Sequence, residues 1–277
     1  MLKRDCGLFV ALVVLVAAAP AQFAAGQEWY IPKPVDVTSE GRFEIGCRLQ
    51  FETDEEGGLE RHETALVPSL SLRGSRVEAY AEVPLAYAHQ ESVVGFDLTS
   101  DSKSGVGDVF TQLTCSLTGG EDWKLLAGLD VVLPTGDDPY DHDVGLGGGF
   151  TTFTPGLTYL KVIDPLVLFG YVGNRFSSHE RFDVGKVEPG NDVRFQGGTT
   201  IYLNPRVRGT VFVAGDIMSC TKIDGDEVEG SDGAAVRFGT GLNVSLSDRQ
   251  TLSFSAVFGM TDQAPDSLVS IGIKCSF

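Results

Sequence analysis

The sequence lacks any long apolar run beyond its first residues. After residue 26, no stretch comes near the roughly eighteen consecutive apolar residues by which a membrane-spanning helix is recognised. Lipid tolerates only helices and closed sheets, because every backbone polar group must find its hydrogen-bond partner within the protein. If this chain enters a membrane, we therefore expect it to do so as a β-barrel.

Basic residues are also scarce. Lys and Arg together number 21 against 38 Asp and Glu, which gives a formal net charge of −17. Nucleic acid requires a basic surface, and docking on anionic lipid headgroups requires a polybasic patch. The composition therefore argues against both kinds of partner.

Cysteine is sparse and widely spaced. Cys6 precedes the apolar N-terminal run, and the other four cysteines are too far apart for a zinc site or a disulfide framework. Cys47 and Cys275 fall on the first and last predicted strands, which would be neighbours in a closed barrel. The sequence therefore leaves open whether these two cysteines form a disulfide. The acidic stretches 137–143 and 223–227 offer oxygen ligands for calcium without completing an EF-hand. We predict no metal and no cofactor, and leave binding of divalent cations by these loops open.

The four histidines show no recognisable catalytic arrangement. None stands in a Ser/His constellation, and the His-x-Ser-Asn-Gly pattern of outer-membrane phospholipases is absent. The sequence therefore predicts that the protein is not an enzyme, and a hydrolase is the less favoured alternative. The histidines lie in or beside predicted loops: His62, His89, His142 and His179.

The N-terminus carries the pattern of an export signal. A short basic start, Met1 to Arg4, precedes the apolar run 8–19, and Ala24, Ala25 and Gly26 offer a cleavage site. We predict a signal peptide over residues 1–26, a periplasmic leader over 27–42 and a single barrel domain over 43–277.

From residue 43 onward, apolar and polar residues alternate in short segments. Phe43, Ile45, Cys47, Leu49 and Phe51 share one parity and alternate with polar or small residues. Side chains of a strand point to opposite faces with a period of two. A soluble sandwich and a membrane barrel both produce this pattern, so one strand does not decide between them.

The connections between these segments do decide. Short turns near residues 74–75, 118–122, 163–165, 204–206 and 247–250 alternate with longer links at 53–63, 88–107, 134–151, 175–192, 218–233 and 261–267. Outer-membrane barrels join their strands by tight periplasmic turns and longer extracellular loops. The sequence therefore predicts an all-β, closed, antiparallel, up-and-down transmembrane barrel of about twelve strands.

Parity also predicts which side chains line the lumen. Pairing across residues 204–206 sets Arg194 opposite Asp216 as an interior ion pair. Four inward aromatic residues either form a slot for a small aromatic solute or simply fill a narrow lumen. The candidates for the solute path are Tyr80, Phe110, Tyr202, Phe212, Arg48, Glu78, Glu82, Lys124, Asp130, Arg194, Asp216 and Arg237.

Two glycine–aspartate elements stand where strands meet a loop. Pairing Leu117 with Trp123 would set Asp108 opposite Val132, so both elements would meet on the outer rim, where an inward Asp108 accepts hydrogen bonds from turn amides. We interpret them as rim architecture rather than a ligand site. The rim residues are Gly107, Asp108, Pro134, Thr135, Gly136 and Asp137.

These elements, with Pro165 to Gly170 and Tyr202 to Pro205, resemble a family of bacterial outer-membrane proteins named for the meta-cleavage pathway of phenol degradation. The resemblance covers roughly residues 100–277 and implies an outer-membrane transporter. The last strand ends on Phe277, which resembles the terminal aromatic residue by which outer-membrane barrels are recognised for assembly. That likeness implies the barrel assembly machinery as a partner.

Together these observations predict an exported protein of the bacterial outer membrane that passes a small, hydrophobic or aromatic solute. Its expected partners are outer-membrane lipid, the assembly machinery and an unidentified solute. A structural or adhesive barrel without transport is the alternative. The sequence does not decide whether the lumen is open or plugged, or whether the protein oligomerises.

Overall fold

The structure, a computed structural model, describes residues 42–277 apart from 57–58, 95–96 and 141–143. The predicted signal peptide lies outside the described residues, as does the predicted leader except for Arg42, which opens the first strand. Within the described part of the chain there is no helix long and apolar enough to cross a membrane.

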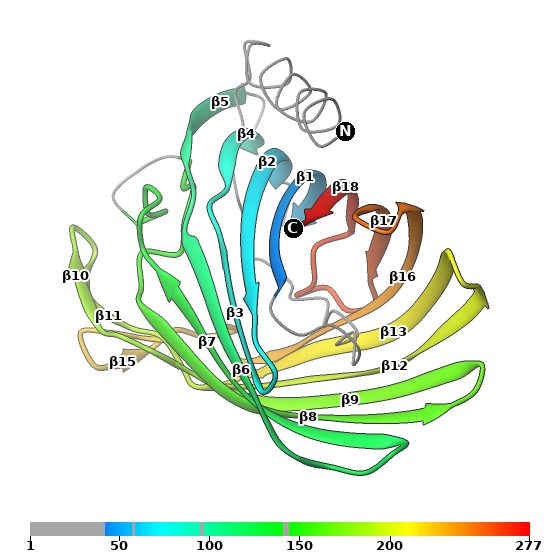
Figure 1. The fold of residues 1–277 in the computed structure, drawn as a ribbon. Coiled ribbons are helices and arrows are strands. Elements are labelled where there is room, and N and C mark those ends of the chain that lie inside the picture. The colour runs from blue at the N-terminus through cyan, green and yellow to red at the C-terminus, as the bar shows by residue number, and fades with distance from the viewer. Residues whose placement is uncertain (1–41, 57–58, 95–96, 141–143) are drawn as a thin grey trace.

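One antiparallel sheet closes on itself to form a barrel (Figure 1). The first strand pairs with the second on one side and with the last on the other. At the seam, the N–H of Phe277 donates to the carbonyl of Phe43 at 2.8 Å. The strands of the wall are β1 (Arg42–Glu56), β2 (Leu59–Arg73), β3 (Val77–Glu82), β4 (Leu85–Val94), β5 (Asp97–Val106), β6 (Val109–Gly119), β7 (Trp123–Leu133), β8 (Thr152–Ile163), β9 (Leu166–Ser177), β12 (Asp192–Asn204), β13 (Val207–Met218), β16 (Gly233–Ser247), β17 (Gln250–Gly259) and β18 (Ser267–Ser276).

Two passes of the wall are interrupted, so the 14 strands of the sheet make a barrel of twelve. β3 and β4 both pair with β2 and are separated at Pro84, which has no N–H to give to a ladder. β5 and β6 lie beside them and are separated at Gly107 and Asp108, where the Gly107 N–H donates to the Pro84 carbonyl at 2.9 Å. The predicted closed, twelve-stranded antiparallel barrel is confirmed.

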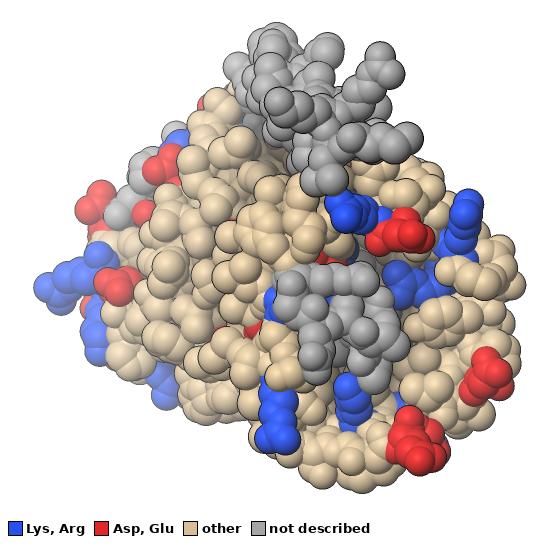
Figure 2. Space-filling model, in the orientation of Figure 1, with Lys and Arg blue, Asp and Glu red and all other residues tan. Residues whose placement is uncertain are grey.

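The two faces of the wall are reversed relative to a soluble sandwich. Large apolar side chains on the outer parity are exposed, among them Phe51 at 46% and Phe258 at 47%. Charged side chains on the inner parity are buried, among them Asp216 at 1% and Arg237 at 3%. Figure 2 shows a broad uncharged wall, with charged side chains gathered toward its ends. This is the distribution of a barrel whose outer face meets lipid.

The barrel has a turn end and a loop end. The turn end carries the start of β1, the end of β18 and the short links, and the loop end carries the long links. In the link 134–151, the residues that the structure describes (134–140 and 144–151) contain no strand, as predicted. Beyond the wall at the loop end, two other links form a small four-stranded sheet (Figure 1). Its strands are β10 (Glu180–Phe182), β11 (Gly185–Glu188), β14 (Lys222–Ile223) and β15 (Asp226–Glu227).

Two of the predicted loops are wrong. Residues 53–56 and 59–63 extend β1 and β2, and residues 88–94 and 97–106 belong to β4 and β5, so these links are long hairpins. The apolar parity used to define strands ends where the wall leaves lipid, whereas the backbone ladder continues beyond it. A strand outside lipid has no need of an apolar face.

The predicted register between β6 and β7 is also wrong. Phe110, not Asp108, lies opposite Val132, because the ladder begins at the turn with Gly119 opposite Lys124 instead of Leu117 opposite Trp123, and a bulge between Ser116 and Thr118 changes this offset by one residue only. The bulge places an extra residue in β6. Asp108 consequently lies at the level of Pro134, where β7 has ended.

Candidate functional site: the lumen

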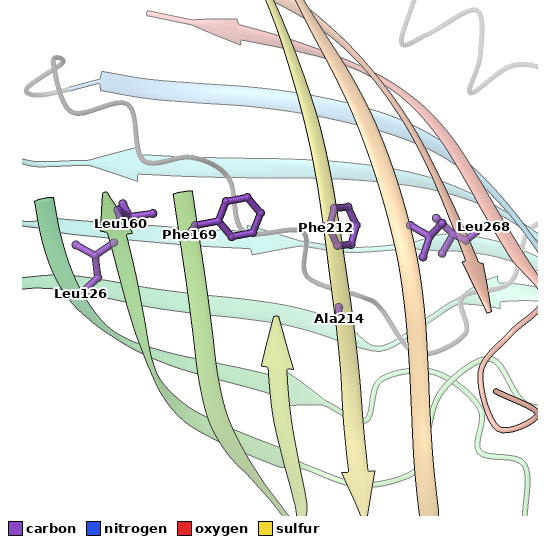
Figure 3. Packing of buried hydrophobic residues seen from close by; sticks show 7 residues of the cluster. Leu126, Leu160, Phe169, Phe212, Ala214 and Leu268 are labelled. Atoms are coloured by element: carbon purple, nitrogen blue, oxygen red, sulfur yellow. The ribbon is translucent and has the colours of Figure 1, made fainter. Parts of the chain in front are cut away.

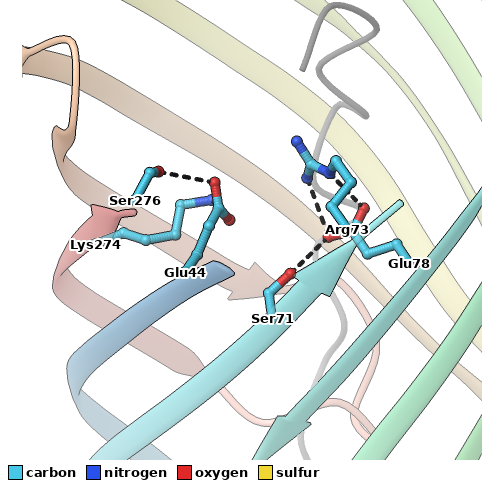
Figure 4. A network of polar contacts seen from close by, with 6 residues as sticks. All are labelled: Glu44, Ser71, Arg73, Glu78, Lys274 and Ser276. Carbon is cyan, nitrogen blue, oxygen red and sulfur yellow. Dashed lines mark hydrogen bonds and ion pairs between the residues drawn. The ribbon is translucent and has the colours of Figure 1, made fainter. Parts of the chain in front are cut away.

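A set of ion pairs lines the lumen at the turn end (Figure 4). Lys274 Nζ donates to Glu44 at 2.7 Å, and Arg73 Nη2 to Glu78 at 3.0 Å. Ser276 and Ser71 hydroxyls complete the same carboxylates, at 3.0 and 3.1 Å. Arg48 and Glu82, both predicted to line the lumen, form a further pair at 3.6 Å. Since each of these three basic groups faces an acidic one, the three pairs add little net charge to the turn end of the lumen.

An apolar row lies farther along the inner wall (Figure 3). Its members are buried and follow one another across neighbouring strands, with two glycines between them. A Cβ on Gly239 would lie 2.7 Å from Phe212 Cε2, and one on Gly198 would lie 2.7 Å from Phe169 Cζ. The two rings therefore rest on backbone that carries no side chain. In order around the wall the row reads Leu160, Phe169, Gly198, Phe212, Gly239, Val257 and Leu268.

Toward the loop end the inner wall becomes charged. The predicted ion pair is present, with Arg194 Nε 2.9 Å from Asp216 Oδ1. One position farther out, Arg175 Nε donates to Asp192 Oδ2 at 2.6 Å. Arg237 is buried on the neighbouring strand β16. These side chains form a charged band on β9, β12, β13 and β16.

Carboxyl groups complete this band on other strands. Glu52 and Glu63 lie directly opposite each other on β1 and β2, and both are buried. Arg61 Nη2 donates to Glu63 at 2.9 Å. Asp130 on β7 accepts a hydrogen bond from Gln112 at 2.8 Å. A solute crossing this level meets both signs of charge within a short distance.

A cavity of about 480 Å³ opens above the charged band at the loop end. One part of its lining is charged and includes Arg175, Arg194 and Arg237. Another part is aromatic and includes Phe110, Tyr140 and Phe150. A volume of this size suits a small organic molecule.

An aromatic cluster contributes Tyr140 and Phe150 to the lining of this cavity. Tyr140 and Phe150 belong to the link between β7 and β8, and Phe182 ends β10. The ring centroids lie 5.6 Å apart for Tyr140 and Phe150, 4.7 Å for Tyr140 and Phe182, and 5.5 Å for Phe150 and Phe182. Burial and the carboxylate of Asp138 raise the pKa of Tyr140, which keeps its hydroxyl neutral in this cluster.

The two glycine–aspartate elements meet, as expected, at the foot of the same link. Asp108 accepts hydrogen bonds from the N–H groups of Gly148 at 2.7 Å and Gly136 at 3.0 Å. The Thr135 hydroxyl donates to the Gly107 carbonyl at 2.7 Å and accepts from the Val109 N–H at 3.0 Å. Lys103 pairs with Asp137 at 2.8 Å. The elements thus join the interruption of the wall to residues 134–148.

The four predicted lumen aromatics do not converge. Tyr80 and Phe110 contact each other, with ring centroids 6.2 Å apart, and the Tyr80 hydroxyl donates to Glu82. Phe212 belongs to the apolar row. Tyr202 is 41% exposed and lies 6.0 Å from the Arg208 guanidinium. A single slot built from these four residues is therefore not present.

The other predicted positions fall in separate levels of the lumen. Lys124 lies opposite Leu160, beside the turn end of the apolar row. The cysteines of the seam are offset by two residues, since Cys47 faces Ile273 and Cys275 faces Ile45, and they form no disulfide with each other.

The described histidines show no catalytic arrangement. His62 pairs with Glu60 at 2.9 Å and His89 with Glu91 at 3.0 Å. Among the residues for which the structure gives a position, no group of three or more His, Cys, Asp or Glu is arranged to hold a metal ion. His142 lies outside the described residues.

Several lining residues were missed by the reading of the sequence. Arg175 and Asp192 each lie one residue beyond a predicted strand end, and continuing the parity by one step would have found them. Glu63 lies in the predicted loop 53–63 and Glu52 directly before it, so the alternation does not predict that the two face each other. The return of residues 144–150 toward the wall has no periodic pattern that predicts it.

Comparison with known proteins places the chain among outer-membrane barrels. The profile of the family described as "Putative MetA-pathway of phenol degradation" matches residues 37–277. The fold is similar to an outer membrane channel from Pseudomonas putida F1, with a TM-score of 0.71 and 15% identity over 88% of this chain and 99% of that one. The KdgM porin is similar with a TM-score of 0.54 and 9% identity, over 84% and 99% of the two chains. The NanC porin gives 0.52 and 10%, over 84% and 98%.

Proposed function

The chain belongs to the family named for the MetA pathway of phenol degradation, and from this premise we propose that it is a passive outer-membrane channel for a small, hydrophobic or aromatic solute. The similar solved structures are a channel and two porins, which supports passage through the lumen as the general activity. In this orientation the turn end faces the periplasm and the loop end faces outward.

The apolar row is the observation that carries the choice of solute. A water-filled lumen gains nothing from inward Phe169, Phe212 and Leu268, whereas a poorly soluble solute gains free energy at each apolar contact. The row runs around the wall from β8 to β18. The cavity at the loop end, here called the outer cavity, has an aromatic part in its lining and lies on the loop side of this row. Weak contacts at several successive positions favour passage over tight binding.

The test is interruption of the ionic current by an aromatic solute. We expect millimolar benzyl alcohol to produce brief closures of single channels in planar bilayers. In the Phe212→Ala variant we expect these closures to shorten by roughly tenfold, because truncating a buried Phe contact costs about 1.4 kcal/mol or more. Phe258→Ala, on the lipid face of β17, is the matched control and should behave as the unchanged protein.

The alternative of a structural or adhesive barrel makes the opposite prediction. Purified protein in a bilayer would then carry no current, and vesicles containing it would not swell in any small solute. Lipase and protease assays on the same material test the hydrolase alternative. His62 and His89 contact the carboxylates of Glu60 and Glu91 and not the side chain of a nucleophile.

A further inference from the structure

Part of the link between β7 and β8 lies inside the barrel. We name residues 144–150 the inner arm. Val144 is 3% exposed and Leu146 is fully buried, and both belong to one apolar cluster with alanines and a valine of the wall. A Cβ built on Gly105 would lie 2.8 Å from Leu146 Cδ1. The wall residues of this cluster are Ala65, Val67, Ala86 and Ala88.

These wall residues face the lumen. Ala65 pairs with Gln50 and Ala86, and Val67 pairs with Arg48, which is on the inner parity of β1. Small side chains here leave room for a second layer against β2 and β4. The inner arm therefore packs on the inner surface of the barrel and not over its rim.

The Asp108 carboxylate joins the arm to the wall. It lies at the interruption between β5 and β6, where the ladder leaves backbone groups available. One oxygen accepts from the Gly148 N–H in the inner arm, and the other accepts from the Gly136 N–H on the opposite side of the link. A carboxylate that accepts from two backbone amides makes strong, directional bonds.

Three further hydrogen bonds fix the arm. Arg61 Nη2 on β2 donates to the Gly145 carbonyl at 2.9 Å. The N–H groups of Leu146 and Gly147 both donate to the Asp137 carbonyl, at 2.6 and 2.9 Å. The arm is thus bound from the wall and from its own link.

The arm supplies one side of the outer cavity. Gly145, Gly147, Gly148 and Phe150 line it together with the arginines of the charged band. A layer of chain laid against the inner wall reduces the cross-section left for a solute.

We propose that Asp108 is a positioning residue that holds the inner arm against the inner wall, and that the arm, rather than the strands, sets the largest solute that passes. The second half of this proposal rests on the proposed channel function. The first half concerns only where residues 144–150 lie and has its own readout.

The permeation test uses two variants that break the same junction differently. Asp108→Ala removes the acceptor. Gly147→Ala keeps the carboxylate but places a Cβ 2.6 Å from Asp108 Cγ, so that the arm must move away. Gly170→Ala is the matched control, because a Cβ there meets nothing within 4 Å. Asp122→Asn, at an exposed turn paired with Lys161, is the control for loss of a carboxylate.

Single-channel conductance and swelling of vesicles in neutral sugars of increasing size are then measured. We expect both junction variants to raise conductance at least about twofold and to admit larger sugars, and both controls to match the unchanged protein. Equal conductance and an equal size limit in all five proteins would overturn the size-setting role of the arm.

The position test does not depend on conduction. A Val144→Cys reporter is placed in a Cys220→Ser background and treated on intact cells with a water-soluble maleimide. We expect slow labelling in this background and labelling at least about tenfold faster when Asp108→Ala or Gly147→Ala is added. Equal labelling rates would overturn the positioning role of Asp108.

The two readouts separate the failures. If no protein in the set conducts but labelling still responds to Asp108, the channel function and the size-setting role fall while the junction stands. If the unchanged protein conducts and the junction variants alter neither readout, the proposal falls while the channel function stands. Should Asp108→Ala fail to assemble, Gly147→Ala carries both tests.

Discussion

At the scale of single residues, the lumen depends on glycines that make room for rings. Phe212 lies over Gly239, and Phe169 lies beside Gly198, so these large inward side chains lie close against the wall. These glycines are needed for close approach, because a methyl group would occupy the same space as the ring. This requirement is invisible in the sequence, where each glycine stands on a different strand from the ring it accommodates.

Gly239→Ala should therefore destabilise the barrel. The added Cβ would lie 2.7 Å from Phe212 Cε2, and overpacking of this kind costs about 1–3 kcal/mol. Urea unfolding in lipid vesicles, followed by tryptophan fluorescence, measures the loss. Gly170→Ala should leave the midpoint unchanged, and an unchanged midpoint for Gly239→Ala as well would show that Phe212 moves aside freely.

The charged band makes a second prediction at this scale. Asp216 is 1% exposed, and its neutral substitute in Asp216→Asn would leave Arg194 without its acidic partner in the lumen. Charges lining a narrow passage focus the local field, so the permeability ratio should shift toward anions by roughly twofold or more. The reversal potential under a potassium chloride gradient reports this ratio. A ratio equal to that of Asp122→Asn would mean that ions do not pass the Arg194 level.

At the scale of elements, the alternation of apolar and polar residues predicted most strands and several facing residues. Features that depend on packing, such as the position of the inner arm, were not predicted. The pairing of Arg194 with Asp216 follows from alternation alone, because a strand register fixes which residues face each other. Asp108 was correctly expected to accept amide hydrogen bonds, although the turn pairs Gly119 with Lys124 and so shifts the register by which Asp108 was placed. The inner arm has no repeating pattern, and its position depends on small residues of β2 and β4 that are distant in the sequence.

The β4 and β5 hairpin shows the opposite limit. Its residues beyond lipid are mostly polar and do not alternate regularly with apolar residues. The sequence therefore predicts a loop, although the backbone pairs from Leu85 and Val106 to Val94 and Asp97. The same applies to the outer part of β1 and β2. Alternation in a sequence thus detects contact with lipid rather than strand structure itself.

The seam between β1 and β18 depends on contacts of the last residue, Phe277. Phe277 contributes the N–H to the Phe43 carbonyl and a ring whose centroid lies 6.0 Å from that of Phe43. Deletion of Phe277 removes both contacts, and it also removes the residue we propose as the recognition point for barrel assembly. We expect the amount of assembled protein in outer-membrane fractions to fall several-fold.

Heat-modifiable migration on gels measures the folded fraction for this deletion. A Phe277→Tyr variant keeps an aromatic end and should restore assembly. Refolding of the deletion in detergent separates the two causes: normal refolding with poor assembly in cells points to recognition, and poor refolding points to the seam. Normal assembly of the deletion variant in cells would show that barrel assembly does not depend on Phe277.

At the scale of the whole molecule, one inversion organises everything else. The outer surface is apolar, and the inner surface changes from paired charges at the turn end, through the apolar row, to the charged band and the outer cavity. The long links return over the loop end, and one of them lines the inner wall. The chemical character of the solute path therefore changes along its length. We expect the path to be narrowest where the inner arm lies against the inner wall.

The most direct test of this inversion is a cysteine scan along β13, residues 208–217, in membranes. Even-numbered positions should react with a water-soluble maleimide wherever side chains leave space, and odd-numbered positions should be reached only by lipid-dissolved quenchers when they carry a fluorophore. Odd positions shielded from both lipid and water, in a protein that stays dispersed without detergent, would contradict the account.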